Sequence, residues 1–272
     1  MINAFFSRWG VVIHGGIDGY SRMITFLQAS DNNFAQTVGL LFVEATGLHG
    51  LPSRIRTDRG GENVIAGRIM ENIRGENRGS WLRGPSVHNQ RIERLWRDLR
   101  QFCTNFYIEL FYRLENMMIL NPDIPSHLFA LHYVFLPRLN WAITEFVLAY
   151  NNHRVRTMNN RTPKQMYFSG LISGYNSNYL HVREILNSTN PVVDWNEYAI
   201  EGDGVRRDEG EHTIVNFPRP SLGLTQENYT LLLQGLRTAV PDVCAHCNDH
   251  DIGYYTQTFL YIQNFLSERE IL

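Results

Sequence analysis

Hydrophobic and polar positions alternate in blocks along the first hundred residues, and these blocks predict an α/β arrangement. Residues 11–17 form a mostly apolar run typical of a buried strand, residues 18–22 a turn, and residues 23–28 a second strand. Asn32 or Asn33 can cap a following helix that places Leu41 and Phe42 on one face, and the β-branched run 54–57 is the next strand. This strand–helix–strand order predicts a sheet that contains a parallel pair.

The rest of the chain is predominantly helical in its pattern. We expect helices over residues 64–73, from residue 89 to about residue 107, over 128–150 with an interruption at Pro137, from Pro163 onward, and over 226–238 and 256–266. Residues 75–79 predict a loop and residues 80–82 a short edge strand. We therefore divide the chain into a core over 1–120, a helical extension over 121–170, an acidic, loop-rich linker over 171–222 and a small helical segment over 223–272.

The charge distribution separates a basic stretch from an acidic one. The net charge is only −2, but residues 54–100 contain 11 Arg against 6 acids, and residues 194–211 contain 7 acids against 2 Arg. Lys164 is the single lysine among the 25 cations, and arginine favours bidentate contacts with phosphate. A compositional bias explains the same preference equally well. No run of 18 apolar residues is present, so we expect no membrane span.

Two carboxylates are the strongest candidates for chemistry. Asp58 directly follows the strand 54–57, in the motif Thr-Asp-Arg-Gly-Gly-Glu-Asn, and Glu93 lies 35 residues later in an amphipathic helix. Carboxylates held on separate elements can bind divalent metal for phosphodiester chemistry. Taken singly, Asp58 is more simply a turn residue, and Glu93 is an i,i+4 partner of Arg97. The metal-site interpretation depends on the two motifs occurring together.

Three segments together resemble the integrase core domain, in the branch known from transposon-derived integrase-like proteins of animal genomes. They are His-Gly-Gly-Ile-Asp-Gly-Tyr-Ser-Arg at 14–22, the Asp58 motif, and His-Asn-Gln-Arg-Ile-Glu-Arg-Leu-Trp-Arg-Asp at 88–98; the resemblance extends over roughly residues 8–170. It implies a ribonuclease-H-like α/β fold, a five-stranded mixed sheet of order 3-2-1-4-5 flanked by helices. It also implies an Asp-Asp-Glu triad that binds Mg²⁺ or Mn²⁺ for DNA strand transfer, with Asp58 as the second acid and Glu93 as the third.

The chain departs from the family pattern at the first acid. Counting back from Arg8-Trp9-Gly10 places that acid at about Met1, and no Asp or Glu precedes Asp18. We expect Asp18 to be a hairpin-turn residue, because its end of the antiparallel second strand lies at the opposite sheet edge from Asp58. We also expect the first strand to be missing, which leaves its two neighbours with unpaired backbone groups. Either the reading frame is truncated or the triad has been lost, and polynucleotidyl transfer is in doubt.

The resemblance and the arginine pattern together predict DNA as the partner. Candidate DNA contacts are Asn89, which lies one turn before Glu93, with His88, Arg59, Arg91, Arg94 and Arg97. The alternative for the arginines is a solvated helix face, and Trp96 is expected in the core. A non-catalytic DNA-binding or assembly module is the competing function. A DNA substrate implies a nuclear location, and the oligomeric state stays open, with a homo-oligomer as one option.

Overall fold

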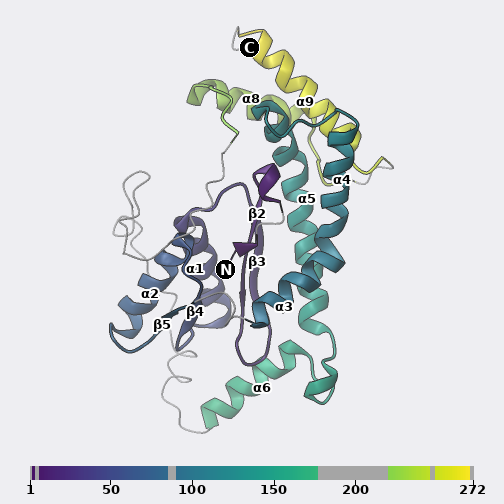
Figure 1. Ribbon diagram of the computed structural model, residues 1–272. Coiled ribbons are helices and arrows are strands. Elements are labelled where there is room, and N and C mark those ends of the chain that lie inside the picture. The colour runs from purple at the N-terminus through teal and green to yellow at the C-terminus, as the bar shows by residue number, and fades with distance from the viewer. Residues whose placement is uncertain (1, 4–5, 85–89, 177–219, 246–248, 270–272) are drawn as a thin grey trace.

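The structure, a computed structural model, describes residues 2–3, 6–84, 90–176, 220–245 and 249–269. Its fold is mixed α/β. Strands β2 (Val12–Ile17) and β3 (Ile24–Ser30) lie between α1 (Ala35–His49) and the long helix α5 (Pro125–Asn152), and α1 packs in turn against α2 (Val64–Arg74). α2, β4 (Ile55–Thr57) and β5 (Trp81–Arg83) thus lie on one side of the β2–β3 hairpin and α3 (Gln90–Leu99) on the other, toward the turn of the hairpin (Figure 1).

The strands form two separate small sheets. β2 and β3 form the predicted antiparallel hairpin, with Val12 opposite Ser30 and a bulge at Gly16 and Ile17. β4 (Ile55–Thr57) pairs in parallel with β5 (Trp81–Arg83), and β5 is the predicted edge strand. The predicted parallel pair therefore exists, but it joins β4 to β5 through α2. Among the described strands, β4 does not pair with the hairpin.

The expectation that the first strand is missing needs a correction. Residues Ile2–Asn3 form a two-residue strand, β1, which pairs antiparallel with β2 on the side away from β3, with Ile2 opposite His14 and Asn3 opposite Ile13. Backbone groups along a strand edge need partners, and these two residues supply them for the first half of β2. Within the described part of the chain, residues 15–17 of β2 have no strand on this side.

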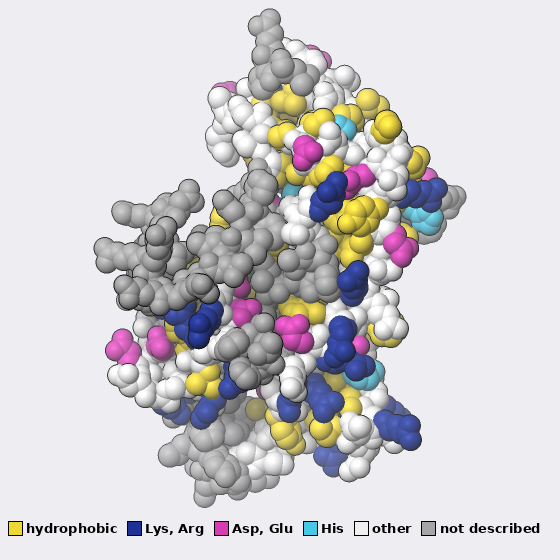
Figure 2. All heavy atoms as spheres, in the orientation of Figure 1, with side chains coloured by type: hydrophobic (Ala, Val, Ile, Leu, Met, Phe, Trp, Pro, Cys, Tyr) yellow, Lys and Arg dark blue, Asp and Glu magenta, His cyan; other side chains and the backbone are white. Residues whose placement is uncertain are grey.

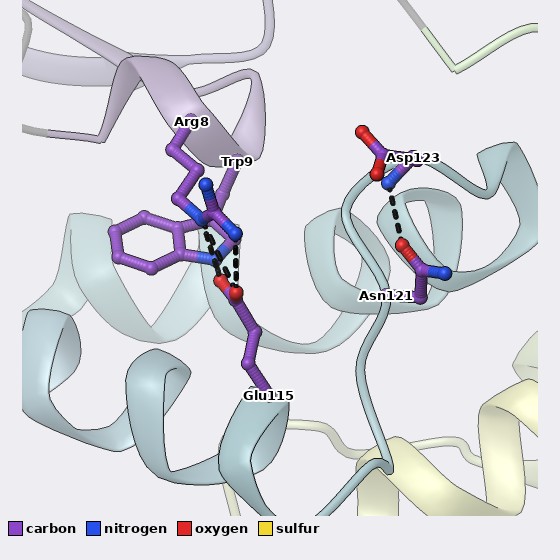
Figure 3. A network of polar contacts seen from close by, with 5 residues as sticks. All are labelled: Arg8, Trp9, Glu115, Asn121 and Asp123. Atoms are coloured by element: carbon purple, nitrogen blue, oxygen red, sulfur yellow. Dashed lines mark hydrogen bonds and ion pairs between the residues drawn. The ribbon is translucent and has the colours of Figure 1, made fainter.

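The N-terminal segment is anchored to the helices by a polar contact. Glu115 of α4 (Asn105–Asn116) accepts hydrogen bonds from Nε and a terminal nitrogen of Arg8, at 3.0 and 2.7 Å, and from the indole Nε1 of Trp9 at 2.7 Å (Figure 3). The hydrogen bonds from Arg8 lower the pKa of the Glu115 carboxyl. The Trp9 ring is buried against Phe111. This contact holds the chain in place just before it enters β2.

The helix predicted from residue 89 to about 107 is longer and carries an irregular turn. It consists of α3 (Gln90–Leu99), a π-helical turn over Arg100–Thr104 and α4. A π-turn inserts one extra residue and rotates the succeeding turns around the helix axis. Phe102 and Phe106 are consequently 71% and 49% exposed, whereas Leu99 and Cys103 stay buried.

Helix α5 continues through Pro137, where the sequence pattern predicts an interruption. A proline within a helix costs about 3 kcal/mol because it removes one backbone hydrogen bond and crowds the preceding turn. The helix buries residues on both sides of this point, Val134 and Phe135 before it and Leu139 and Ile143 after it, against β3 and α9 (Ile252–Ser267). This burial offsets the cost of the proline.

The C-terminal helices complete the same hydrophobic core. α8 (Gln226–Ala239) and α9 form as predicted, and Leu232, Leu236, Tyr255 and Ile262 pack in one cluster with Trp9 and the buried face of α5. Arg138 of α5 forms an ion pair with Asp251 at 2.8 Å. Most of the predicted linker, residues 177–219, lies outside the described residues, and the proposed domain boundaries stay predictions. In the described part of the chain, none of the helices combines the length and the apolar character that a membrane span requires.

Candidate nucleic-acid and metal site

Asp58 lies where the sequence predicts it, directly after β4. Its Oδ1 accepts hydrogen bonds from the Asn63 side-chain amide at 2.7 Å and from the Gly60 backbone at 3.4 Å. The preceding residue, Thr57, is fixed by the Trp81 indole of β5, which donates to its hydroxyl at 3.0 Å. Two strands and a short turn therefore hold this carboxylate at a defined edge of the small parallel sheet.

Glu62 is a second carboxylate at this edge that the sequence analysis did not single out. It is 6% exposed, and the Asn63 amide that binds Asp58 also donates to Glu62 Oε1 at 2.8 Å. Burial raises the pKa of Glu62, and the nearby charge of Asp58 raises it further. A Cβ at Gly60 would meet the Glu62 carboxylate, so a larger residue there would require that side chain to move. The signal in the sequence is the spacing Asp-Arg-Gly-Gly-Glu-Asn.

Helix α3 separates an apolar face from an arginine face. Ile92, Leu95, Trp96 and Leu99 are buried, which confirms that Trp96 belongs to the core. Arg91, Arg94, Arg97 and Arg100 are exposed, as is Glu93. Arg94 forms an ion pair with Asp98 at 3.1 Å, whereas the described contacts include no ion pair between Glu93 and Arg97. In Figure 2, dark-blue side chains gather on the lower right face, over α3 and the adjoining end of α5.

Parts of the two predicted motifs border one cavity, although Asp58, Glu62 and Glu93 are not among the residues that line it. A space of about 870 Å³ is lined by residues 15–17 of β2, by all of β4 with Arg54 beside it, and by residues 90–92 in the first turn of α3. Asn63, which binds both Asp58 and Glu62, lines it as well. Elements about 35 residues apart in the chain thus meet here, and Arg54, Arg56 and Arg91 bring positive charge to the same space.

Of the other candidates, Asp18 and Arg59 are described by the structure, and His88 and Asn89 are not. Asp18 is a turn residue as predicted: its Oδ2 accepts from the Tyr20 and Ser21 backbone amides at 3.1 and 2.7 Å. Arg59 is exposed beside Asp58. His88 and Asn89 lie outside the described residues, so their predicted DNA contacts stay predictions.

The carboxylates fit a divalent cation only in part. Mg²⁺ prefers oxygen ligands and is often bound through one or two carboxylates with several waters, which matches the donor set of Asp58 and Glu62. Within the residues that the structure describes, however, no three His, Cys, Asp or Glu side chains gather closely enough to hold a metal. The clamp of two ions needs a further shared carboxylate at this edge. No step of phosphodiester chemistry follows from this arrangement alone.

Comparison with known proteins identifies the family. The family model described as "Integrase core domain" matches residues 2–180, well over half of the chain. No curated protein and no solved structure matches the chain. The matched region contains both sheets, the Asp58–Glu62 edge, α3 and α5. The chain therefore belongs to the integrase core domain family.

Proposed function

We propose that the chain binds DNA through the arginine face of α3 and the rim of the adjoining cavity, and that Asp58 and Glu93 are metal-binding acids of a ribonuclease-H-like polynucleotidyl-transfer site. The observation that carries the proposal is the meeting of β4 and the first turn of α3 at one cavity bordered by Arg54, Arg56 and Arg91. Descent from a mobile-element integrase and a nuclear location are parts of the same proposal.

The residues of this chain have separable roles in the proposal. Exposed arginines contact phosphate oxygens and set the position of the duplex on the protein. Asp58 and Glu93 would bind Mg²⁺ or Mn²⁺, with Glu62 beside Asp58, and a divalent ion at such a site supplies activation of a water or hydroxyl for attack on a phosphodiester. The Asn63 amide donates to both Asp58 and Glu62 and so holds the two carboxylates beside each other.

Salt-dependent DNA binding tests the first part of the proposal. We expect the affinity for a fluorescent duplex to fall steeply with KCl, because each phosphate contact releases a counterion and adds about 0.9 to the slope of log K against log salt. The triple variant Arg91→Ala/Arg94→Ala/Arg97→Ala should lower that slope by about 2 to 3. The matched control Arg68→Ala/Arg113→Ala/Arg237→Ala removes the same charge from exposed positions on α2, α4 and α8. Equal losses in both variants would reject a specific arginine face.

Nicking of supercoiled DNA tests the second part. A metal-dependent enzyme should nick the plasmid with Mg²⁺ or Mn²⁺, and not with EDTA, and should lose this activity in Asp58→Asn and in Glu93→Gln. The second candidate function, a non-catalytic DNA-binding module, is favoured by the absence of any cluster of three acids among the described residues. It predicts the same salt slope without nicking under any metal condition. Nicking that survives both substitutions would reject the assigned acids.

A further inference from the structure

A second basic segment lies outside the motifs considered so far. No Asp or Glu occurs from residue 146 to residue 183, although this stretch contains Arg154, Arg156, Arg161 and Lys164. All four of these side chains are exposed. No carboxylate among the described residues forms an ion pair with any of them. We refer to residues 153–164, which connect α5 to α6 (Pro163–Asn176) and include the first two residues of α6, as the basic turn.

The basic turn is closed by its own backbone and does not depend on its charged side chains. Val155, which is buried, pairs with Arg161 in an isolated antiparallel bridge, its amide donating to the Arg161 carbonyl at 3.0 Å. Asn159 and Asn160 take left-handed conformations with φ of 53° and 58°, which asparagine tolerates well. Thr162 and Gln165 cap α6 reciprocally, at 3.0 and 3.1 Å. The cations are therefore presented from a defined loop.

The last turn of α5 connects the basic turn with α3. Tyr150, in that last turn, packs against the hydrophobic cluster to which the buried face of α3 belongs. The Tyr150 ring contacts the ring of His153, the first residue of the basic turn, with 4.9 Å between centroids. Figure 2 shows dark-blue side chains continuing from α3 over this lower part of the molecule. The two basic elements are thus linked through Tyr150 and lie on the same face of the molecule in this view.

We propose that the basic turn is a second phosphate-contact surface, which binds the backbone of the same duplex that lies on α3. The inference rests on the proposed DNA binding. Its chemistry matches phosphate: the exposed side chains are arginine, lysine, asparagine, threonine and one histidine, and the first four types contact phosphate oxygens and sugar in protein–DNA complexes. A protein partner usually needs an apolar centre in its interface. The basic turn offers none, since Val155 is buried and Met158 is partly covered.

The experiment compares three triple variants on one fluorescent duplex across a KCl series. Arg154→Ala/Arg156→Ala/Arg161→Ala tests the basic turn, Arg91→Ala/Arg94→Ala/Arg97→Ala tests α3, and Arg68→Ala/Arg113→Ala/Arg237→Ala is the charge-matched control. We expect the basic-turn variant to lower the salt slope by about 2 to 3, one contact for each arginine at about 0.9. Replacement of the same three residues by lysine should restore most of the slope, because it restores the charge. Thermal unfolding of each variant checks that the fold is intact.

The outcomes separate this inference from the proposed function. If the α3 variant loses slope and the basic-turn variant does not, the inference is wrong and DNA binding at α3 stands. If neither variant differs from wild type, both the inference and the proposed DNA binding at α3 are wrong. If the control loses as much slope as the basic-turn variant, the effect is one of net charge and the inference is rejected. Poly-glutamate that competes with the duplex for the wild type, but not for the basic-turn variant, would assign the surface to an acidic polypeptide.

Discussion

His14 makes the hairpin sensitive to acid. It lies in β2, is 1% exposed, and its ring Nε2 lies 3.1 Å from the Asn32 carbonyl. Because a carbonyl only accepts, Nε2 carries the proton in the neutral ring, and the buried Nδ1 has no hydrogen-bond partner among the described residues. Burial lowers the pKa of His14 from 6.5 to about 4, an effect that the Asn32 carbonyl partly offsets. A charged imidazole is therefore strongly disfavoured in the folded protein.

The sign and size of the pH effect follow from linkage. Between pH 6.5 and about 4 the unfolded chain binds a proton at His14 and the folded chain does not, so the contribution to stability is present above pH 6.5 and is lost as the pH falls toward 4. At about 1.4 kcal/mol per pKa unit, the loss near pH 4 amounts to about 3 kcal/mol. That is a large fraction of the usual stability of a domain.

Urea unfolding at several pH values measures this effect. His14→Gln removes the titrating ring and keeps an amide that can donate to Asn32. The free energy of unfolding of the wild type, minus that of the variant, should fall by about 3 kcal/mol between pH 7.5 and pH 4. His132 is also buried, with its pKa lowered by desolvation, and its contribution cancels in this difference. A difference that does not change with pH would refute the reasoning from burial.

Three further predictions concern the anchor, the acidic edge and the π-turn. Glu115→Ala leaves the buried Trp9 indole without its acceptor, so urea unfolding should show a loss of about 1–3 kcal/mol, unlike in Glu115→Gln, which keeps an acceptor. Glu62→Gln should raise the melting temperature at neutral pH and not at pH 4. An acid whose pKa is raised in the folded protein stabilises the fold below its unfolded pKa and loses that contribution as the pH rises. An unchanged melting temperature at pH 7 would contradict this prediction. Leu99→Ala should cost about 2–5 kcal/mol in urea unfolding, whereas Phe102→Ser should change stability by less than about 0.5 kcal/mol, and equal costs would contradict the π-turn.

Local patterns in the sequence predict much of the fold and one part of the site. The hairpin, the position of Asp58 after a short strand and the buried face of α3 all follow from spacing along a single element. Such patterns depend on residues a few positions apart, and each of these features is determined by residues that close in the chain. The exposed arginines of α3 are predictable for the same reason.

The features that the sequence did not predict depend on contacts between distant residues. Nothing local indicates a π-turn at residues 100–104, and the continuity of α5 through Pro137 depends on packing against β3 and α9. Glu62 was missed because its role comes from burial and from sharing the Asn63 amide with Asp58. The basic turn was missed because its charge is distributed over a loop and has no periodicity.

The cavity between the two sheets connects the stability of the fold with the completeness of the acidic site. β1 reaches only Ile13 and His14, so residues 15–17 of β2 and the whole of β4 face the same space. A strand lying in this space could form backbone hydrogen bonds with both edges, each contributing about 0.5–1.5 kcal/mol. Such a strand would join the sheets in the order 3-2-1-4-5 that the family resemblance implies. Its residues would also lie beside Asp58, the position at which a shared carboxylate would complete the clamp for two ions. A strand in this position would therefore determine both whether the two sheets join and whether a further carboxylate lies beside Asp58.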